Sequence, residues 1–255
     1  MMSDARQDLL ASVLDRALKA GASACDGRIS EVASLSANVR LGKLESVERE
    51  ENAAISLRCF VGQRQAHVSG SDVSPDSLDR LVSRCVEMAR LAPEDRFAGL
   101  PDIRETEASP PSLDRSGDAQ MEPARLEALA REAETAALAV AGVDNSGGAG
   151  ASWSSGQSWV AASNGFSGHM VSGSVSLGLS VTARSDTGME RDYAGRARRR
   201  LADLPDPAEI GREAGERAVA RINPRKIASR RAPVIYERRL AGRLIAAFVS
   251  AISGP

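Results

Sequence analysis

The sequence has few aromatic residues and few of the side chains that usually hold metal ions. Of its 255 residues, 3% are aromatic, two are histidines and three are cysteines. With so few rings, the core has to be built from leucine, valine, isoleucine and alanine. His67 and His169 are far apart in the chain, and neither an H-E-x-x-H nor a C-x-x-C motif is present. The composition therefore predicts no metal site in this chain and favours surface or lightly packed histidines.

The cysteines Cys25, Cys59 and Cys85 are odd in number, and each lies in an apolar pattern. Buried, reduced thiols are the simplest interpretation, and they fit a reducing compartment. The N-terminus lacks an apolar run behind a basic start, and no stretch reaches the ~18 apolar residues of a membrane span. We therefore expect a cytoplasmic protein with no membrane contact.

An excess of positive charge is also lacking, because the formal net charge is −1. A dedicated nucleic-acid binder usually has a basic face, so this balance argues against one. Two basic runs stand out, at 196–200 and 225–231, and a solvated surface explains both. Aromatic side chains that could stack on bases are almost absent near them. These runs motivate one alternative, a stand-alone regulatory module that acts on a DNA-topology enzyme.

Motifs for nucleophilic catalysis and phosphate binding are equally scarce. No G-x-S-x-G elbow is present. The Gly/Ser-rich segment 147–156 lacks the Lys-Ser/Thr ending of a phosphate-binding loop, so it is predicted to be a flexible loop rather than an anion cradle. A hydrolase that uses His67 or His169 is the third hypothesis.

Apolar residues at helical spacing predict five amphipathic helices. Ser3 or Asp4 can cap the first and Gly21 can end it, while Ser74-Pro75 and Asp206-Pro207 each combine a cap with proline at the first helical position. The predicted helices cover residues 9–18, 75–92, 123–140, 207–223 and 240–252.

Between these helices, alternating patterns predict two antiparallel meanders, at 27–70 and 157–195. Gly42-Lys43 and Gly62-Gln63 supply the turns of the first, and its central strand carries so many glutamates that part of it must face water. Asn164-Gly165 predicts a two-residue turn with positive φ at both positions, and Asp186-Thr187-Gly188 a further turn. A short strand is predicted at Val234-Ile235-Tyr236.

The order of these elements predicts an α+β fold, in which two antiparallel meanders are flanked by amphipathic helices. Residues 1–228 form an N-terminal domain of two helix–sheet–helix halves, with a long surface loop at 93–121. Residues 229–255 are expected to begin a second domain.

Several stretches, taken in order, resemble the TldD/PmbA family, and its PmbA (TldE) branch in particular. No single motif is decisive, but their succession along nearly the whole chain is specific. The matching stretches are GASACDGRISE (21–31), VRLGKLESVEREENAAISLRCFVGQRQAHVSGSD (39–72), AASNGFSGHMVSGSVSLGLSV (161–181), MERDYAGRA (189–197), IGREAGERAVARINPRK (210–226) and INPRKIASRRAPVIYERRLAGRLIAAFVSAISGP (222–255).

Family members are close to twice as long, so the resemblance implies that this chain corresponds to their N-terminal part. In the TldD branch, the helix after a segment that resembles 232–236 carries H-E-x-x-x-H, which holds zinc and supplies the base. The corresponding helix here has Ala246, Ala247 and Ser250, none of which ligates zinc well. No catalytic, cofactor-binding or metal-binding residue is therefore expected in this chain.

The resemblance implies a non-catalytic subunit of a TldD–TldE type zinc metallopeptidase, which degrades or matures extended peptides and small unfolded proteins. Zinc would be held by a TldD-like catalytic partner, in a hetero- or homo-oligomer that encloses a chamber. The family's older label, modulator of DNA gyrase, then reflects an indirect effect rather than DNA binding. An antiparallel meander offers an edge to which an extended peptide can add as a strand.

Overall fold

The computed structural model describes residues 5–106, 113–186 and 188–253. The chain divides into two compact units, Met1–Asn223 and Pro224–Pro255. The division falls five residues before the boundary expected from the sequence. That the second unit begins another domain stays a prediction.

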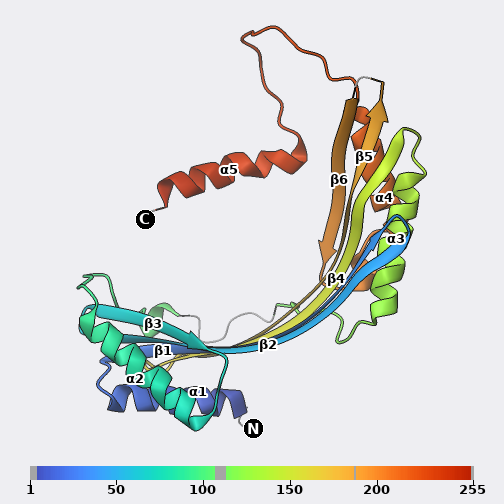
Figure 1. Ribbon diagram of the computed structural model, residues 1–255. Coiled ribbons are helices and arrows are strands. Elements are labelled where there is room, and N and C mark those ends of the chain that lie inside the picture. Colours follow the sequence, from blue (N-terminus) through green and yellow to red (C-terminus); the bar gives the residue numbers. More distant parts are fainter. Residues whose placement is uncertain (1–4, 107–112, 187, 254–255) are drawn as a thin grey trace. The chain divides into compact units, whose positions relative to one another are not determined.

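The first unit is built on one antiparallel sheet of six strands, in the order β3-β2-β1-β4-β5-β6. Figure 1 shows its long strands bending together along their length. The strands are β1 (Ala24–Arg40), β2 (Lys43–Val61), β3 (Arg64–Gly70), β4 (Val143–Ala162), β5 (Ser167–Ser185) and β6 (Gly188–Arg198). This confirms the α+β fold class with two meanders, β1-β2-β3 and β4-β5-β6.

The two meanders are joined by pairing between β1 and β4, which runs from Asp26 opposite Ala162 to Val39 opposite Ala149. The sequence did not predict this pairing, because the two strands are separated by two helices and a long loop. As a result, one continuous sheet replaces two separate ones.

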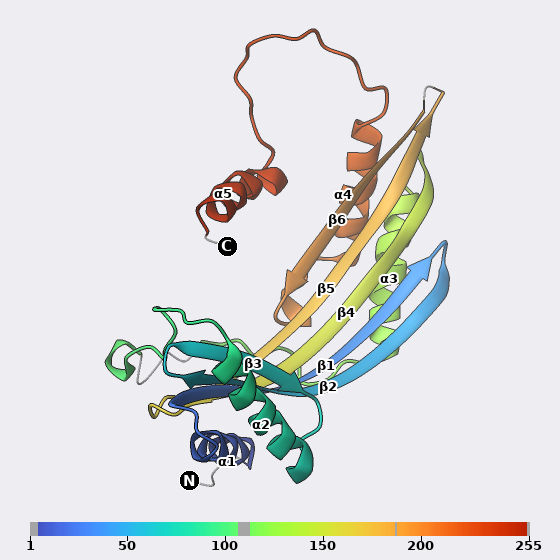
Figure 2. The ribbon, with the colours of Figure 1, turned by 60° about the vertical axis from the view of Figure 1, so that its left-hand side comes forward.

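Helices cover one face of this sheet in two places. Helices α1 (Ala5–Lys19) and α2 (Pro75–Leu91) lie at one end, and α3 (Pro123–Leu138) and α4 (Pro207–Ala220) lie at the other. Figures 1 and 2 show all four on the convex side. We call this side the helix face and the opposite, concave side the serine face.

Each helix pair closes its own hydrophobic core over odd-numbered residues of β1. Cys25 and Ile29 pack under α1 and α2, whereas Leu35, Ala37 and Val39 pack under α3 and α4. The same alternation in β4 places Trp159 in the first core and Trp153 in the second. One strand thus contributes to two cores, because its helix face is covered at both ends but not in the middle.

Several turn and cap predictions need correction. Ser74 forms no side-chain bond to the α2 N-terminus, since its hydroxyl donates to Asp72 instead. The loop after β4 is longer than two residues, and within it only Gly165, not Asn164, has positive φ. Gly21 does have positive φ just after α1, whereas Ser3, Asp4 and Thr187 lie outside the described residues.

The Gly/Ser-rich segment 147–156 is a strand, not the flexible loop expected from its composition. Ala149, Ala151 and Trp153 alternate into the core, and small residues between them face the serine face. At Gly150, a Cβ would lie 2.7 Å from the Asn38 side-chain oxygen, so a larger residue would displace that amide. Glycine at this position leaves room for the Asn38 side chain of the neighbouring strand.

The long loop expected at 93–121 contains one short 3-10 helix, η1 (Ile103–Glu105), and residues 107–112 lie outside the described part of the chain. A second 3-10 helix, η2 (Leu201–Asp203), follows β6. Asp206 caps α4 as expected, because its side chain accepts a bond from the Ala208 N–H.

The second unit consists of a segment without regular secondary structure, 224–237, followed by helix α5 (Arg238–Ile252). The strand expected at Val234–Tyr236 is absent, because no described segment pairs with these residues. Helix α5 is present as expected, and its apolar stripe is exposed, with Phe248 64% accessible. No helix among the described residues has the length and apolar character needed to cross a membrane.

Candidate functional site

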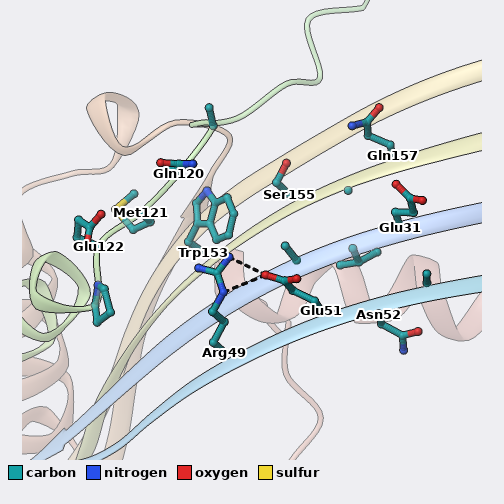
Figure 3. Close-up of a pocket in the computed structure, with 16 residues that line it drawn as sticks. Glu31, Arg49, Glu51, Asn52, Gln120, Met121, Glu122, Trp153, Ser155 and Gln157 are labelled. Atoms are coloured by element: carbon teal, nitrogen blue, oxygen red, sulfur yellow. Dashed lines mark hydrogen bonds and ion pairs between the residues drawn. The ribbon is translucent and has the colours of Figure 1, made fainter. Parts of the chain in front are cut away.

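The uncovered middle of the helix face contains a trench of about 560 Å³ between the two cores. Strands β1, β2 and β4 form its floor, and residues 119–123, just before α3, form one side. Its polar lining is shown in Figure 3. The residues of the trench used below are Glu31, Arg49, Glu51, Glu122, Trp153 and Gln157.

Ion pairs and one buried ring fix the lining of this trench. Arg49 pairs with Glu51 at 2.7 Å, and Glu31 pairs with Arg6 of α1 at 2.5 Å. The Trp153 indole is 4% exposed and donates to the Asp118 carbonyl at 2.9 Å. That bond ties the segment before α3 to the sheet, so the trench has one ordered side. Trp153 gives it an aromatic floor between charged residues.

The serine face is lined by small hydroxyl side chains from the three central strands. Ser152 and Ser176 lie 2.8 Å apart, and Ser154 and Ser174 lie 3.0 Å apart, as hydrogen-bonded pairs across β4 and β5. The other members are Ser30, Ser34, Ser36, Ser158, Ser172 and Ser180. Side chains converge on the inside of a curved sheet, so small residues suit this face.

This concave surface is polar and uncharged in its centre, and helices α1 to α4 lie on the opposite face. At one end it is bordered by the loop that carries η1, because Pro101 and Thr106 line a hollow there with Arg28. Ser158 is the one buried side-chain oxygen or nitrogen among the described residues that has no hydrogen-bond partner. Sequence reasoning missed the whole surface. The signal in the sequence is serine at every second position of 172–176, which by itself indicates only the polar half of an alternating strand.

The structure does not bring the two histidines together. His67 lies on β3, while His169 lies on β5, stacked on Trp159 at 4.9 Å and hydrogen-bonded to Gln157 at 3.2 Å. Strands β2, β1 and β4 lie between them, which separates them by roughly 19 Å at the usual strand spacing. No shared catalytic centre can be built from them, and a hydrolase that uses His67 or His169 alone stays a hypothesis.

The three cysteines, distant in sequence, lie in one core. Cys25 is opposite Cys59 in the β1–β2 register, and the Cys85 thiol of α2 lies 3.3 Å from the Leu57 carbonyl. All three are free and fully buried, as the sequence predicted. Burial raises the pKa of the Cys25 thiol to about 11. The Cys85 hydrogen bond and burial also raise the pKa of Cys59.

These thiols are expected to resist alkylation in the folded protein, because all three are fully buried. The raised pKa of Cys25 also makes its reactive thiolate scarce, whereas the hydrogen bond with Cys59 lowers the pKa of Cys85, so Cys85 depends on burial alone. Iodoacetamide at pH 8 should leave Cys25, Cys59 and Cys85 unmodified for hours, and should modify all three in denaturant. Mass spectrometry after timed quenching measures this. Rapid modification of Cys25 in native protein would show that α1 and α2 open readily.

The basic runs are used differently in the two units. Arg196 pairs with Glu213 of α4 at 2.7 Å, and Arg200 binds Asp114 at 2.6 Å, which lowers the pKa of that carboxyl. Arg199 donates to the Arg115 carbonyl at 3.1 Å. Much of the first run therefore makes contacts within the protein. The second run, 225–231, lies in the segment 224–237 and is exposed.

The residues of α5 do not fit a zinc site. Ala246 and Ala247 offer no donor atom, and the Ser250 hydroxyl is a poor ligand when neutral. Across residues 5–106, 113–186 and 188–253, no group of three or more histidine, cysteine, aspartate or glutamate side chains is placed to hold a metal ion. The expectation of no metal or catalytic residue in this chain stays a prediction.

Comparison with known proteins identifies the family of the chain. The central domain of the PmbA/TldA metallopeptidases matches residues 117–222, and domain 1 of the same family matches residues 25–89. Together these matches cover more than half of the sequence. The chain belongs to the PmbA/TldD family. The first matched region contains β4, β5, β6 and α4, and the second contains the β1-β2-β3 meander with most of α2.

Two curated relatives within the PmbA/TldD family show the extent of the likeness. Metalloprotease PmbA of Escherichia coli O157:H7 is 30% identical over 98% of this chain and 57% of its own length. The PmbA homologue of Haemophilus influenzae is 31% identical over 94% of this chain and 53% of its own length. The chain thus spans about half the length of the curated relatives it matches.

Solved structures agree on the fold. A protein from Bacteroides thetaiotaomicron, described as a modulator of DNA gyrase, superimposes with a TM-score of 0.85 at 21% identity, over 98% of this chain and 58% of the other. TldE of Thermococcus kodakarensis gives 0.69 at 16% identity, over 84% and 47%. At these sequence identities, the structural similarity shows a shared fold and does not show a shared function.

Proposed function

We propose that this chain supplies the non-catalytic, PmbA/TldE-like part of a TldD–TldE type zinc metallopeptidase. The observation that supports it is helix α5, where Ala246, Ala247 and Ser250 offer no good zinc ligand, in a chain that belongs to a metallopeptidase family. In this proposal a TldD-like subunit holds the zinc and performs the hydrolysis. The substrates are extended peptides and small unfolded proteins, which are matured or degraded.

The first unit suits a supporting role rather than a catalytic one. Its concave serine face is polar and small-featured, so it can line a chamber without binding one side-chain type strongly. Three buried thiols without a disulfide fit a reducing compartment, and we place the complex in the cytoplasm on that ground.

The alternative, a stand-alone module that acts on DNA gyrase, receives less support. Its motivation is the two basic runs, 196–200 and 225–231. Arg196 and Arg200 of the first run are paired with acidic side chains, whereas the second run is exposed and remains the surface on which this alternative would depend. The name of the Bacteroides relative describes that protein and does not place a DNA-binding surface on this one.

The test is activity that depends on two chains. We expect co-purification of this chain with a TldD-like protein from the same genome, and peptide cleavage by the pair that exceeds cleavage by either chain alone. Replacing the zinc-motif glutamate of the partner should abolish cleavage, whereas Ser250→Ala in this chain should leave it unchanged. Full activity of the partner alone, with no complex formed, would refute the proposal.

A further inference from the structure

Half of strand β2 is an open edge of the sheet. Strand β3 pairs with β2 only from Ile55, opposite Gly70, to Val61, opposite Arg64. The remaining part, 43–54, pairs with β1 on one side and with no described strand on the other. Every residue from 47 to 53 is exposed. Backbone groups along this stretch are available to another strand.

The direction of these backbone groups follows from the sheet register. Ser163 donates its N–H to the Cys25 carbonyl, so odd-numbered residues of β1 direct their backbone groups to β4. Odd residues of β2 lie opposite them, as Ala33 lies opposite Glu51. They therefore direct their N–H and C=O groups away from β1, toward the open edge. Four residues do so: Val47, Arg49, Glu51 and Ala53.

The even residues of this edge place acidic side chains on the serine face. Glu48 lies opposite Ser36, and Glu50 opposite Ser34. Neither carboxylate forms an ion pair with another described residue, in contrast to Glu51, which pairs with Arg49. Glu50 also borders a hollow of about 300 Å³ with Ser30, Ser34 and Asn52.

Both faces beside the edge are thus hollowed, one by the trench and one by this smaller cavity. A strand added to β2 would send alternate side chains to each face. The two side chains of the added strand that lie opposite Glu48 and Glu50 would be two residues apart and on the serine face. Each would lie next to a carboxylate that forms no ion pair with a described residue. Opposite charges directly across a strand pair stabilise it, so lysine or arginine is favoured at both positions.

We propose that the β2 edge, residues 47–53, binds an extended peptide with basic residues at alternate positions. The identification of this peptide as a substrate rests on the function proposed above, while the binding itself does not. Charged edges also keep sheets from associating with one another, and that simpler role predicts no peptide binding. The two accounts therefore differ in a measurable result.

The probe is a fluorescein-labelled nine-residue peptide in which lysine alternates with valine, and binding is followed by fluorescence anisotropy on the 255-residue chain alone. A matched peptide carries glutamate in place of lysine and should bind about tenfold more weakly or not at all. Methylation of the valine amides, which would point at β2, should abolish binding. Methylation of the lysine amides, which would point away, should not.

Variants of the protein locate the site. Glu48→Lys with Glu50→Lys should weaken the lysine peptide about tenfold and favour the glutamate peptide. The control Glu87→Lys with Glu132→Lys changes the net charge equally on exposed helical positions and should bind as the original does. Arg49→Pro removes one outward N–H without removing a bond to β1, so it should reduce binding more than Arg49→Ala.

Absence of binding at low salt, or binding indifferent to peptide charge or to which amides are methylated, would overturn the proposal. Self-association through this edge, seen by light scattering and abolished by Arg49→Pro, would also overturn it in favour of a second copy. If peptide binding holds while the two-chain cleavage assay fails, the edge is a peptide site and the proposed function is wrong.

Discussion

Replacing Glu134 by leucine is expected to lower the free energy of unfolding by about 3 kcal/mol, because two charge-assisted hydrogen bonds are lost. Glu134 lies on α3, is 1% exposed, and accepts the backbone N–H groups of Leu41 at 2.9 Å and Gly42 at 2.8 Å. Both turn residues have positive φ, at 49° and 71°. One carboxylate therefore holds the β1–β2 turn in a conformation that leucine rarely adopts.

Two further variants separate charge from shape at this site. Glu134→Gln keeps the size but one side-chain oxygen instead of two, so a smaller loss of about 1.5 kcal/mol is expected. Glu132→Leu, on an exposed position of the same helix, should have little effect. Urea denaturation followed by tryptophan fluorescence measures all three, since Trp153 lies in the core beside α3. Equal stability of the Glu134 and Glu132 variants would contradict the role assigned to this carboxylate.

Local patterns in the sequence predict the elements of this fold well. The alternation Ile55, Leu57, Cys59 and the helical spacing from Leu78 to Ala89 each describe a surface that is apolar on one side, and each element buries that side. Proline after an N-cap position marks the start of α2 and α4 in the same way. These signals are reliable because each depends only on the spacing of nearby residues within a single helix or strand.

Local sequence patterns do not specify which distant segments pair with one another. The largest differences between the predicted and the observed fold arise from such pairing. The β1–β4 pairing joins two meanders that each look complete in the sequence. Two of the buried positions in segment 147–156, Ala149 and Ala151, are alanine rather than a large apolar residue, so the apolar side of its alternation is weak. Val234–Tyr236 has strand-forming side chains but no described partner, and strand propensity alone does not fix a strand.

The candidate site has the same origin. The open edge depends on where β3 ends, and the trench depends on where α1 and α3 leave the sheet uncovered. No sequence motif marks either of these boundaries. The glutamates of β2 were recognised as facing water, which is correct. Their placement at an unpaired edge needed the register of three strands.

Replacing Gly211 by alanine is expected to destabilise the protein, although alanine is the better helix former. Gly211 lies on α4 where it crosses α3, and a Cβ there would lie 2.1 Å from the Ala133 carbonyl oxygen. The obstacle is backbone, so the helices must separate over the core that contains Ile210 and Ala214. Overpacking of this kind costs about 3 kcal/mol, against a propensity gain of about 1 kcal/mol. We therefore expect a net loss of about 2 kcal/mol.

The matched control for Gly211→Ala is Gly242→Ala in α5, where no atom lies within 4 Å of the added Cβ. That substitution should leave the fluorescence-detected unfolding midpoint unchanged, because both tryptophans belong to the sheet. Gly215→Ala should cost less than Gly211→Ala. Its Cβ would lie 2.7 Å from a Val140 methyl group and 3.0 Å from the Ala137 carbonyl oxygen, whereas the Gly211 Cβ would lie 2.1 Å from a carbonyl oxygen. The reverse order of the two α4 variants would show that α3 and α4 separate easily and that the close crossing contributes little to the fold.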